Sequence, residues 1–430
     1  MTNLNKSNIS IMTEVYAGVA TFLSLVYVLS VNPAILKAAG MPAPALFTAT
    51  ALGAMFATLI MCFVARLPFV VAPGMGLNAF FAFSVVNGMG FTWQQALTAV
   101  FIAGIIFVFI SLSPVRKKML QEVPESLQLA VAAGIGLMIS YIGLKGGGLV
   151  VILPDGNVTI GALTKGNGML TIIGLFVTAV FIARNNRYAL LLGIIITTII
   201  GIPLGITDIS GISPSTIFTL PPSISELFFK FDFSILTNFN FWAVVFTFLF
   251  MCVFDSLASF IGLFSVMGQE AELYRHRMGK AFIADSLGVV AGSMVGLSPN
   301  TTYAESGAGV AMGGRTGLTA FTVVVLFAIC LFFSRLFLLV PSSAVAPALV
   351  LVGLLMLASI RNLNFADKTE SFPAFVVIVL TCLTWRLSDS LAIGWLIYIL
   401  MKVLAGKAGT ITPTVWVVGV LFFFKELFVG

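Results

Sequence analysis

The stretch SPNTTYAESGAGVAMGGRTG, residues 298–317, lies between long apolar blocks and decides how the fold is interpreted. It places an ionisable side chain, Glu305, among Ser, Thr and Gly residues that do not favour a continuous helix. Irregular backbone at membrane depth is tolerated only where it is buried in protein or lines a cavity. The stretch therefore predicts a broken helix whose carboxylate and freed backbone groups face a cavity inside a membrane protein.

The composition predicts an all-α integral membrane protein. Of 430 residues, 59% are hydrophobic and 9% are charged, whereas soluble domains carry about 25% charged residues. Basic residues in cytoplasmic loops explain the net charge of +6 better than nucleic-acid binding does. One histidine and four separated cysteines predict no metal site, and no motif calls for a cofactor.

Apolar blocks of the length that crosses a bilayer, about 20 residues, recur along the chain. We expect about 14 transmembrane segments, with the pair at 371–385 and 388–404 as a re-entrant hairpin. The blocks lie near 15–36, 43–65, 69–88, 93–113, 125–144, 168–184, 187–206, 241–267, 280–297, 300–315, 317–335, 340–359, 371–385, 388–404 and 411–427.

Basic residues predict the orientation of these segments, because cytoplasmic loops carry an excess of Lys and Arg. Clusters lie at 116–118, 184–187 and 275–280. Alternating spans put all three clusters on the side of the N-terminus. We therefore expect a multi-pass protein of the inner or plasma membrane with a cytoplasmic N-terminus.

The two halves of the chain echo one another. VPES (123–126) opens a block ending in GIGLM, and VPSS (340–343) opens one ending in VGLLM. Each follows a Gly/Pro-interrupted segment, at 71–83 and 297–309, by two spans. Seven spans separate the copies, so they have opposite topology, and paired broken helices in an inverted repeat mark a transporter's binding site. The alternative is that Gly, Pro and Ser merely relieve packing in two unrelated helices.

Three carboxylates fall inside predicted spans: Asp255, Asp285 and Glu305. Placing such a group at the bilayer centre costs at least ~2.5–3.5 kcal/mol, so it is a functional candidate. No Lys or Arg lies deep in any span to pair with Asp255 or Glu305, which favours a proton-coupled site over a structural ion pair. Asp285 lies near the basic loop at 275–280, and we expect it to tether helices.

The polar groups expected around these carboxylates favour a neutral ligand. Thr302 and its neighbours offer hydroxyls, Asn78 offers an amide, and Phe80 offers a flat aromatic face. Carboxylates accept N–H donors in pairs, so the set suits a planar molecule with several such donors. An anion fits poorly because nothing cationic faces the site. Without a nucleophile–base pair, we expect no enzyme activity.

The chain resembles the AzgA-like purine permeases, a branch of the nucleobase–cation symporters with guanine/hypoxanthine and adenine carriers. The likeness covers nearly the whole chain. It is carried by TEVYAGVATFLSLVYVLSVNP (13–33), APGMGLNAFFAFSVV (72–86), FDSLASFIGLF (254–264), ADSLGVVAGSMVGLSPNTTYAESGAGVAMGGRTGLTA (284–320) and VPSSAVAPALVLVGLLML (340–357).

The resemblance implies a seven-plus-seven inverted repeat with broken third and tenth segments, divided into two domains. The core domain would comprise 1–114 and 241–338, and the gate domain 115–240 and 339–430. It also implies proton symport through Asp255 or Glu305, and a homodimer formed through the gate. The implied substrate-binding residues are Asp255, Glu305, Tyr303, Ala304, Asn78 and Phe80, with Thr21 and Tyr27 from the first span.

Two departures from the family pattern bear on the substrate. The glycine expected after the eighth-span aspartate is absent from FDSLA (254–258), and Ala304 replaces an isoleucine. The run GLNAF (76–80) is typical of the guanine/hypoxanthine branch. We therefore expect an importer of hypoxanthine and guanine. The alternatives are an adenine permease, a sulfate or dicarboxylate carrier of the same fold, and a channel or scaffold without a bound substrate.

Overall fold

The computed structural model describes residues 10–113, 124–153, 157–186, 188–210, 217–384 and 386–429. Within them, eight helical stretches are long and apolar enough to cross a membrane, which confirms the predicted helical membrane fold. These stretches are Ile11–Ala39, Ala43–Ala65, Trp93–Leu112, Glu125–Gly146, Gly166–Ala183, Phe239–Phe264, Gly317–Leu338 and Ser342–Asn362. The predicted orientation rests in part on the basic residues at 116–118 and on Arg187. These positions lie outside the described residues.

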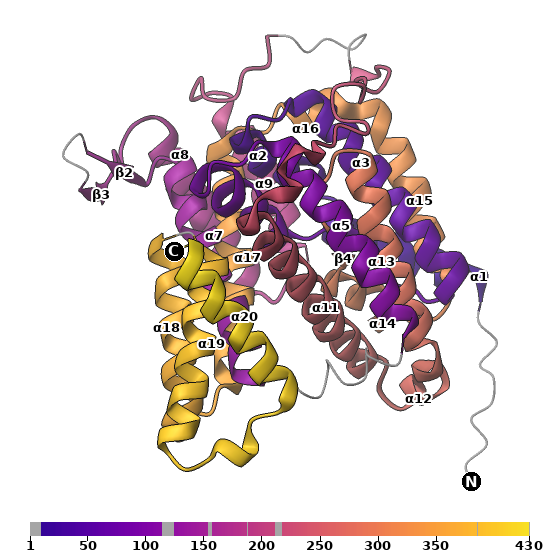
Figure 1. Cartoon of the computed structure of the whole chain (residues 1–430). Helices are drawn as coiled ribbons and strands as arrows, with labels where there is room; N and C mark the ends of the chain where they lie inside the picture. Colours follow the sequence, from indigo (N-terminus) through magenta and orange to yellow (C-terminus); the bar gives the residue numbers. More distant parts are fainter. Residues whose placement is uncertain are drawn as a thin grey trace.

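The contacts group the helices into two bundles. Figure 1 shows α18, α19 and α20 on one side of α11 and α1, α3, α13 and α15 on the other. In the first bundle, α13 packs on α3 and α5, and α15 packs on α1 and α3. Its elements are α1 (Ile11–Leu25), α2 (Val28–Leu36), α3 (Ala43–Ile60), α4 (Met75–Ala79), η3 (Phe80–Gly88), α5 (Trp93–Leu112), α11 (Phe239–Met267), α12 (Ala271–Tyr274), α13 (Met278–Met294), α14 (Gly307–Ala311), α15 (Gly317–Cys330) and α16 (Ser334–Leu338).

In the second bundle, α7 packs on α17 and α18, α8 packs on α9, and α19 packs on α18 and α20. Its elements are α7 (Glu125–Gly146), α8 (Gly166–Ala183), α9 (Ala189–Gly201), α17 (Ser342–Leu357), α18 (Lys368–Thr384), α19 (Leu387–Leu404) and α20 (Pro413–Val429). A hairpin of β2 (Val150–Ile152) and β3 (Val158–Ile160) joins α7 to α8. Figure 1 shows α18, α19 and α20 together at one edge of the molecule.

Small residues let α7 and α17 approach closely. A Cβ atom on Gly136 would lie 2.6 Å from the carbonyl oxygen of Gly353, and one on Gly353 would lie 2.0 Å from Oγ of Ser140. Lipid provides no hydrophobic force between helices, so such close van der Waals packing must hold the pair together. The glycines of this pair therefore fix the crossing at the centre of the second bundle.

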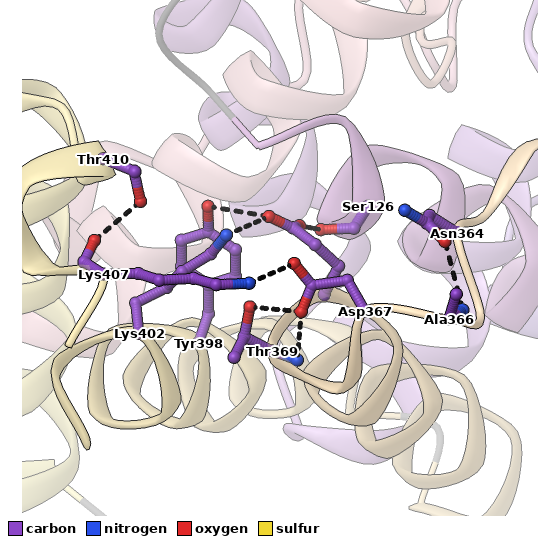
Figure 2. A network of polar contacts seen from close by, with 10 residues as sticks. Ser126, Asn364, Ala366, Asp367, Thr369, Tyr398, Lys402, Lys407 and Thr410 are labelled. Carbon is purple, nitrogen blue, oxygen red and sulfur yellow. Dashed lines mark hydrogen bonds and ion pairs between the residues drawn. The ribbon is translucent and has the colours of Figure 1, made fainter. Parts of the chain in front are cut away.

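A polar cluster ties three helices of the second bundle together (Figure 2). Nζ of Lys402, on α19, lies 2.6 Å from Oε1 of Glu370 on α18. Ser126, at the start of α7, donates a hydrogen bond to the other oxygen of Glu370. The Tyr398 hydroxyl donates to Oε1 of Glu370 over 3.3 Å. Because the Lys402 side chain is only 8% exposed, the pair is shielded and joins α7, α18 and α19.

The two interrupted segments meet as a short antiparallel ribbon in the first bundle, which confirms the predicted breaks. β1 (Val71–Pro73) pairs with β4 (Asn300–Thr302), with Ala72 opposite Thr301. The half-helices α4 and α14 follow the two strands in the chain. Both strands are buried, and their pairing satisfies backbone groups that a broken helix leaves free. The ribbon fixes where each half-helix begins.

Candidate functional site

The site is built around the turn of the tenth segment that carries Glu305. The 3-10 turn η7 (Ala304–Ser306) follows the β1–β4 ribbon directly. The first span, Ile11–Ala39, stays helical through Val26 and Tyr27, which lie between α1 and α2, and Tyr27 lies beside this turn. The Tyr27 hydroxyl donates a hydrogen bond of 2.7 Å to Oε1 of Glu305. Ala304 is exposed and Glu305 is half-buried, so the carboxylate remains accessible.

The helix α11 brings the second carboxylate to the same region. Asp255 is exposed, as are Ala258 and Gly262, which follow at the three- and four-residue spacing of one helix face. The Thr301 side chain, from β4, hydrogen-bonds the Asp255 carboxylate. Asp255 and Glu305 lie close enough to interact electrostatically. Among the described residues, no salt bridge involves either of them.

Asp285 lies behind Asp255 and is fully buried. Its carboxylate accepts hydrogen bonds from the Ser256 hydroxyl, next to Asp255 on α11, and from Oγ1 of Thr302, at 2.9 Å, on β4. Asp285 itself belongs to α13. These hydrogen bonds join α11, α13 and β4, three elements of the first bundle. Thr302 is thereby turned toward Asp285 rather than toward the accessible carboxylates.

The Asn78 side chain is not accessible to a ligand in this structure. It is fully buried, and its Nδ2 donates to Oδ1 of Asn32 over 2.6 Å. Its own Oδ1 accepts a hydrogen bond from Ser298. Asn32 in turn donates to Oγ1 of Thr50 over 2.6 Å. The amide thus links the third, tenth, first and second segments, which differs from the expected contact with a base.

Phe80 is likewise placed inside the first bundle. It is fully buried, and its ring packs edge-on against Phe248 of α11, with the centroids 4.9 Å apart. The expected stacking on a ligand would require this pair to open. The ring therefore forms part of the wall behind the site, not of its accessible surface.

Two further expected residues support the broken segments. The Tyr303 hydroxyl donates to the carbonyl oxygen of Pro73 over 2.5 Å, and its backbone N–H donates to Val70. Thr21 is fully buried, and no hydrogen-bond partner of its hydroxyl lies among the described residues. A Cβ atom on Gly309 would lie 2.2 Å from that hydroxyl. Both residues therefore fix the backbone around Glu305.

Sequence reasoning missed Asn32, Ser256 and Ser298, which hold the site from behind. Asn32 has a detectable signal, because a buried amide in an otherwise apolar span must find partners. Ser256 and Ser298 carry no such signal, since serines are common in membrane helices. Of the expected residues, Asp255, Ala304 and Glu305 reach the accessible surface, and Tyr27 contacts Glu305 from beneath it.

The arrangement accepts hydrogen bonds and offers no positive charge. The groups at the surface are two carboxylates, and the buried Thr301 hydroxyl contacts Asp255 from behind. Within the described part of the chain, no group of three or more His, Cys, Asp or Glu residues could hold a metal ion. Broken helices around accessible carboxylates in a multi-pass bundle define a membrane transport protein.

Comparison with known proteins agrees with this class. Residues 12–393 match the model of the Permease family (Xan_ur_permease), and the chain belongs to that family. It is therefore a multi-pass membrane permease and not an enzyme.

Two relatives align along nearly the whole chain. It is 40% identical to the adenine permease AdeP of Escherichia coli over 97% of this chain and 93% of that protein. It is 38% identical to the guanine/hypoxanthine permease PbuO of Bacillus subtilis over 99% of both chains.

A solved structure shows the same fold at low sequence identity. The transmembrane domain of the cyanobacterial bicarbonate transporter BicA superimposes with a TM-score of 0.65 at 16% identity. The match covers 90% of this chain and 98% of that domain.

Proposed function

We propose that the protein imports purine nucleobases, with hypoxanthine and guanine favoured, by proton symport. The observation that carries this proposal is the environment of Glu305. One carboxylate oxygen accepts the Tyr27 hydroxyl, which leaves the other to accept a ring N–H of the base. Asp255 is accessible beside it and supplies two further acceptor oxygens.

The charge of the site supports a neutral ligand. Two carboxylates interact with each other, and no described salt bridge neutralises either one. An anion would have to approach both without a cation to offset the repulsion. This is why a base is favoured over sulfate or a dicarboxylate, although the fold is also that of a bicarbonate transporter.

The preferred base follows from the run GLNAF at 76–80, which favours hypoxanthine and guanine. Relatives named for guanine/hypoxanthine and for adenine are nearly equally similar to this chain. Adenine is therefore the alternative substrate. Asn78, in this run, is hydrogen-bonded to Asn32 and Ser298, and we propose that the run acts by shaping the site.

The proposed proton carrier is Asp255 or Glu305. Both are accessible carboxylates, and no described salt bridge pairs either of them with a cation. A proton that neutralises one carboxylate removes the electrostatic repulsion between the two. Transport then requires the first bundle, as the core domain (1–114 and 241–338), to move against the second, as the gate domain (115–240 and 339–430). Alternating access by such rocking is typical of inverted-repeat transporters.

Uptake of radiolabelled hypoxanthine into cells that lack their own purine carriers tests the proposal. Unlabelled guanine, adenine, xanthine, uracil and sulfate serve as competitors, and an uncoupler tests proton coupling. We expect saturable uptake that guanine blocks and the uncoupler abolishes. Block by adenine alone would select the alternative base, and block by sulfate would contradict the proposal.

A further inference from the structure

A cavity lies between the two bundles, and neither Asp255 nor Glu305 lines it. Its volume is about 240 Å³, and it is lined by Phe83, Asn87, Gly88, Leu383 and Thr384. The first three residues belong to η3 in the first bundle, and the last two end α18 in the second. At about 30 Å³ per water molecule, the space corresponds to about eight waters, which suits one small planar molecule.

The polar side chains of this cavity come from both bundles. Nδ2 of Asn87 donates one of its two hydrogens to the carbonyl oxygen of Ala38 over 3.2 Å, which leaves the other N–H to donate and Oδ1 to accept. Oγ1 of Thr384 donates its only hydrogen to the carbonyl oxygen of Leu380 over 2.7 Å and accepts the backbone N–H of Arg386 over 3.2 Å, so one lone pair remains for a further bond. No charged residue lines the cavity. The site therefore suits a neutral ring that carries both N–H donors and an acceptor atom.

The apolar lining suits the flat faces of such a ring. Phe83 is 9% exposed and Leu383 is 74% exposed, and they come from different bundles. An aromatic ring and an aliphatic side chain on opposite walls can enclose a planar heterocycle, because aromatic faces favour stacked contacts.

The cavity and the carboxylates lie at different depths. The end of η3 is followed in the chain by α5. Gln95, near the start of α5, donates a hydrogen bond to Asp232, which precedes α11. The end of η3 and the start of α11 therefore lie on one face of the molecule. The buried Phe80–Phe248 pair lies deeper along these two helices. Asp255 follows Phe248 by seven residues, about 10 Å of helix. The aromatic pair thus separates the cavity from Asp255.

We propose that this cavity is an outer subsite of the transport path, in which a neutral N–H-bearing base binds before it reaches Glu305. The inference rests on the proposed import of nucleobases. Asn87 and Thr384 accept N–H donors of the base from the two bundles, and Phe83 and Leu383 cover its faces. Movement between the bundles then separates the two walls and releases the base inward.

The test compares initial rates of radiolabelled hypoxanthine uptake in the unmodified protein, Asn87→Ala, Thr384→Val and the double variant. Thr159→Val, an exposed position on β3, is the matched control. Each lost hydrogen bond weakens binding severalfold, so we expect KM to rise about tenfold in the double variant while the maximal rate changes less than twofold. Thr384→Ser keeps the acceptor and should restore KM.

The outcomes separate this inference from the proposed function. If the unmodified protein takes up no base, the proposed function fails and the subsite fails with it. If the unmodified protein transports hypoxanthine and the double variant has an unchanged KM, only the subsite is overturned. A raised KM that Thr384→Ser does not restore also overturns it, because loss of packing rather than of an acceptor would then be the cause. An unchanged thermal midpoint of the purified variants confirms that they are folded.

Discussion

Tyr27 and Glu305 are 278 positions apart in the chain, yet the Tyr27 hydroxyl donates a 2.7 Å hydrogen bond to the Glu305 carboxylate. Tyr27 lies between α1 and α2, where the first span stays helical, and Glu305 lies in the turn before α14. Because Tyr27 is 3% exposed and Glu305 is half-buried, the bond orients an accessible carboxylate from the protein side. The first span and the broken tenth segment therefore meet at one site.

Removal of the Tyr27 hydroxyl should weaken substrate binding. Tyr27→Phe keeps the ring and deletes one hydrogen bond to a charged group, which is worth about 1.5–3 kcal/mol. Glu305 then loses its fixed orientation, and we expect the KM for uptake to rise about tenfold. Tyr16→Phe on the exposed side of α1 is the matched control. Equal KM values for both variants would show that Tyr27 does not orient Glu305.

Asp255 and Asp285 should respond differently to the same substitution. Asp255 is exposed, whereas Asp285 is fully buried and accepts from Ser256 and Thr302. Asp285→Asn replaces an acceptor with a donor inside this network, which should destabilise the protein by about 1–3 kcal/mol. Asp255→Asn should leave stability unchanged and abolish transport. Thermal unfolding and uptake, measured on both variants, distinguish the two roles, and the reverse pattern would refute them.

Gly309, the second glycine after the Glu305 turn, should not tolerate a side chain. A Cβ atom on Gly309 would lie 2.2 Å from Oγ1 of Thr21 and 2.4 Å from the carbonyl oxygen of Ala17. Gly309→Ala must therefore push α1 away from α14, and we expect a lower thermal midpoint and little uptake. On Gly307 the nearest atom would be 3.7 Å away, so Gly307→Ala is the control and should transport normally. Normal uptake by Gly309→Ala would mean that α1 is free to move.

The ion pair of the second bundle should stabilise only as a pair. Lys402→Met leaves Glu370, which is 23% exposed, without its cation. Loss of one partner of a buried pair costs about 3–5 kcal/mol, and the remaining exposure of Glu370 puts the expected value at the low end. Lys402→Met combined with Glu370→Leu should recover most of the lost stability. A double variant as unstable as the single one would show that packing, not charge, dominates here.

The sequence predicted the broken third and tenth segments because their Gly, Pro and polar residues stand out against apolar spans. It also made Asp255 and Glu305 the candidate site residues, since an intramembrane carboxylate is conspicuous in a chain with 9% charged residues; their roles stay a prediction. It could not predict that Asn78 and Phe80 turn inward. Their direction depends on Asn32, Ser298 and Phe248, which come from other segments. Side-chain direction across such distances is set by tertiary packing and leaves no local pattern.

The contact between the first span and Glu305 could not be predicted for a similar reason. Residues 13–33 read as one apolar helix, as the structure has them. Nothing local to this helix shows that Tyr27 donates a hydrogen bond to Glu305, far along the chain. The partition into core and gate domains remains a prediction, although contacts group the helices into two bundles.

Equilibrium binding of radiolabelled hypoxanthine to the purified protein tests the central claim most directly. The unmodified protein, Glu305→Gln and the exposed control Glu226→Gln are compared in the same detergent. Loss of a hydrogen bond to a charged group predicts binding at least about tenfold weaker in Glu305→Gln, with the control unchanged. Hypoxanthine binding of equal affinity in Glu305→Gln and the unmodified protein would contradict the claim that Glu305 holds the base.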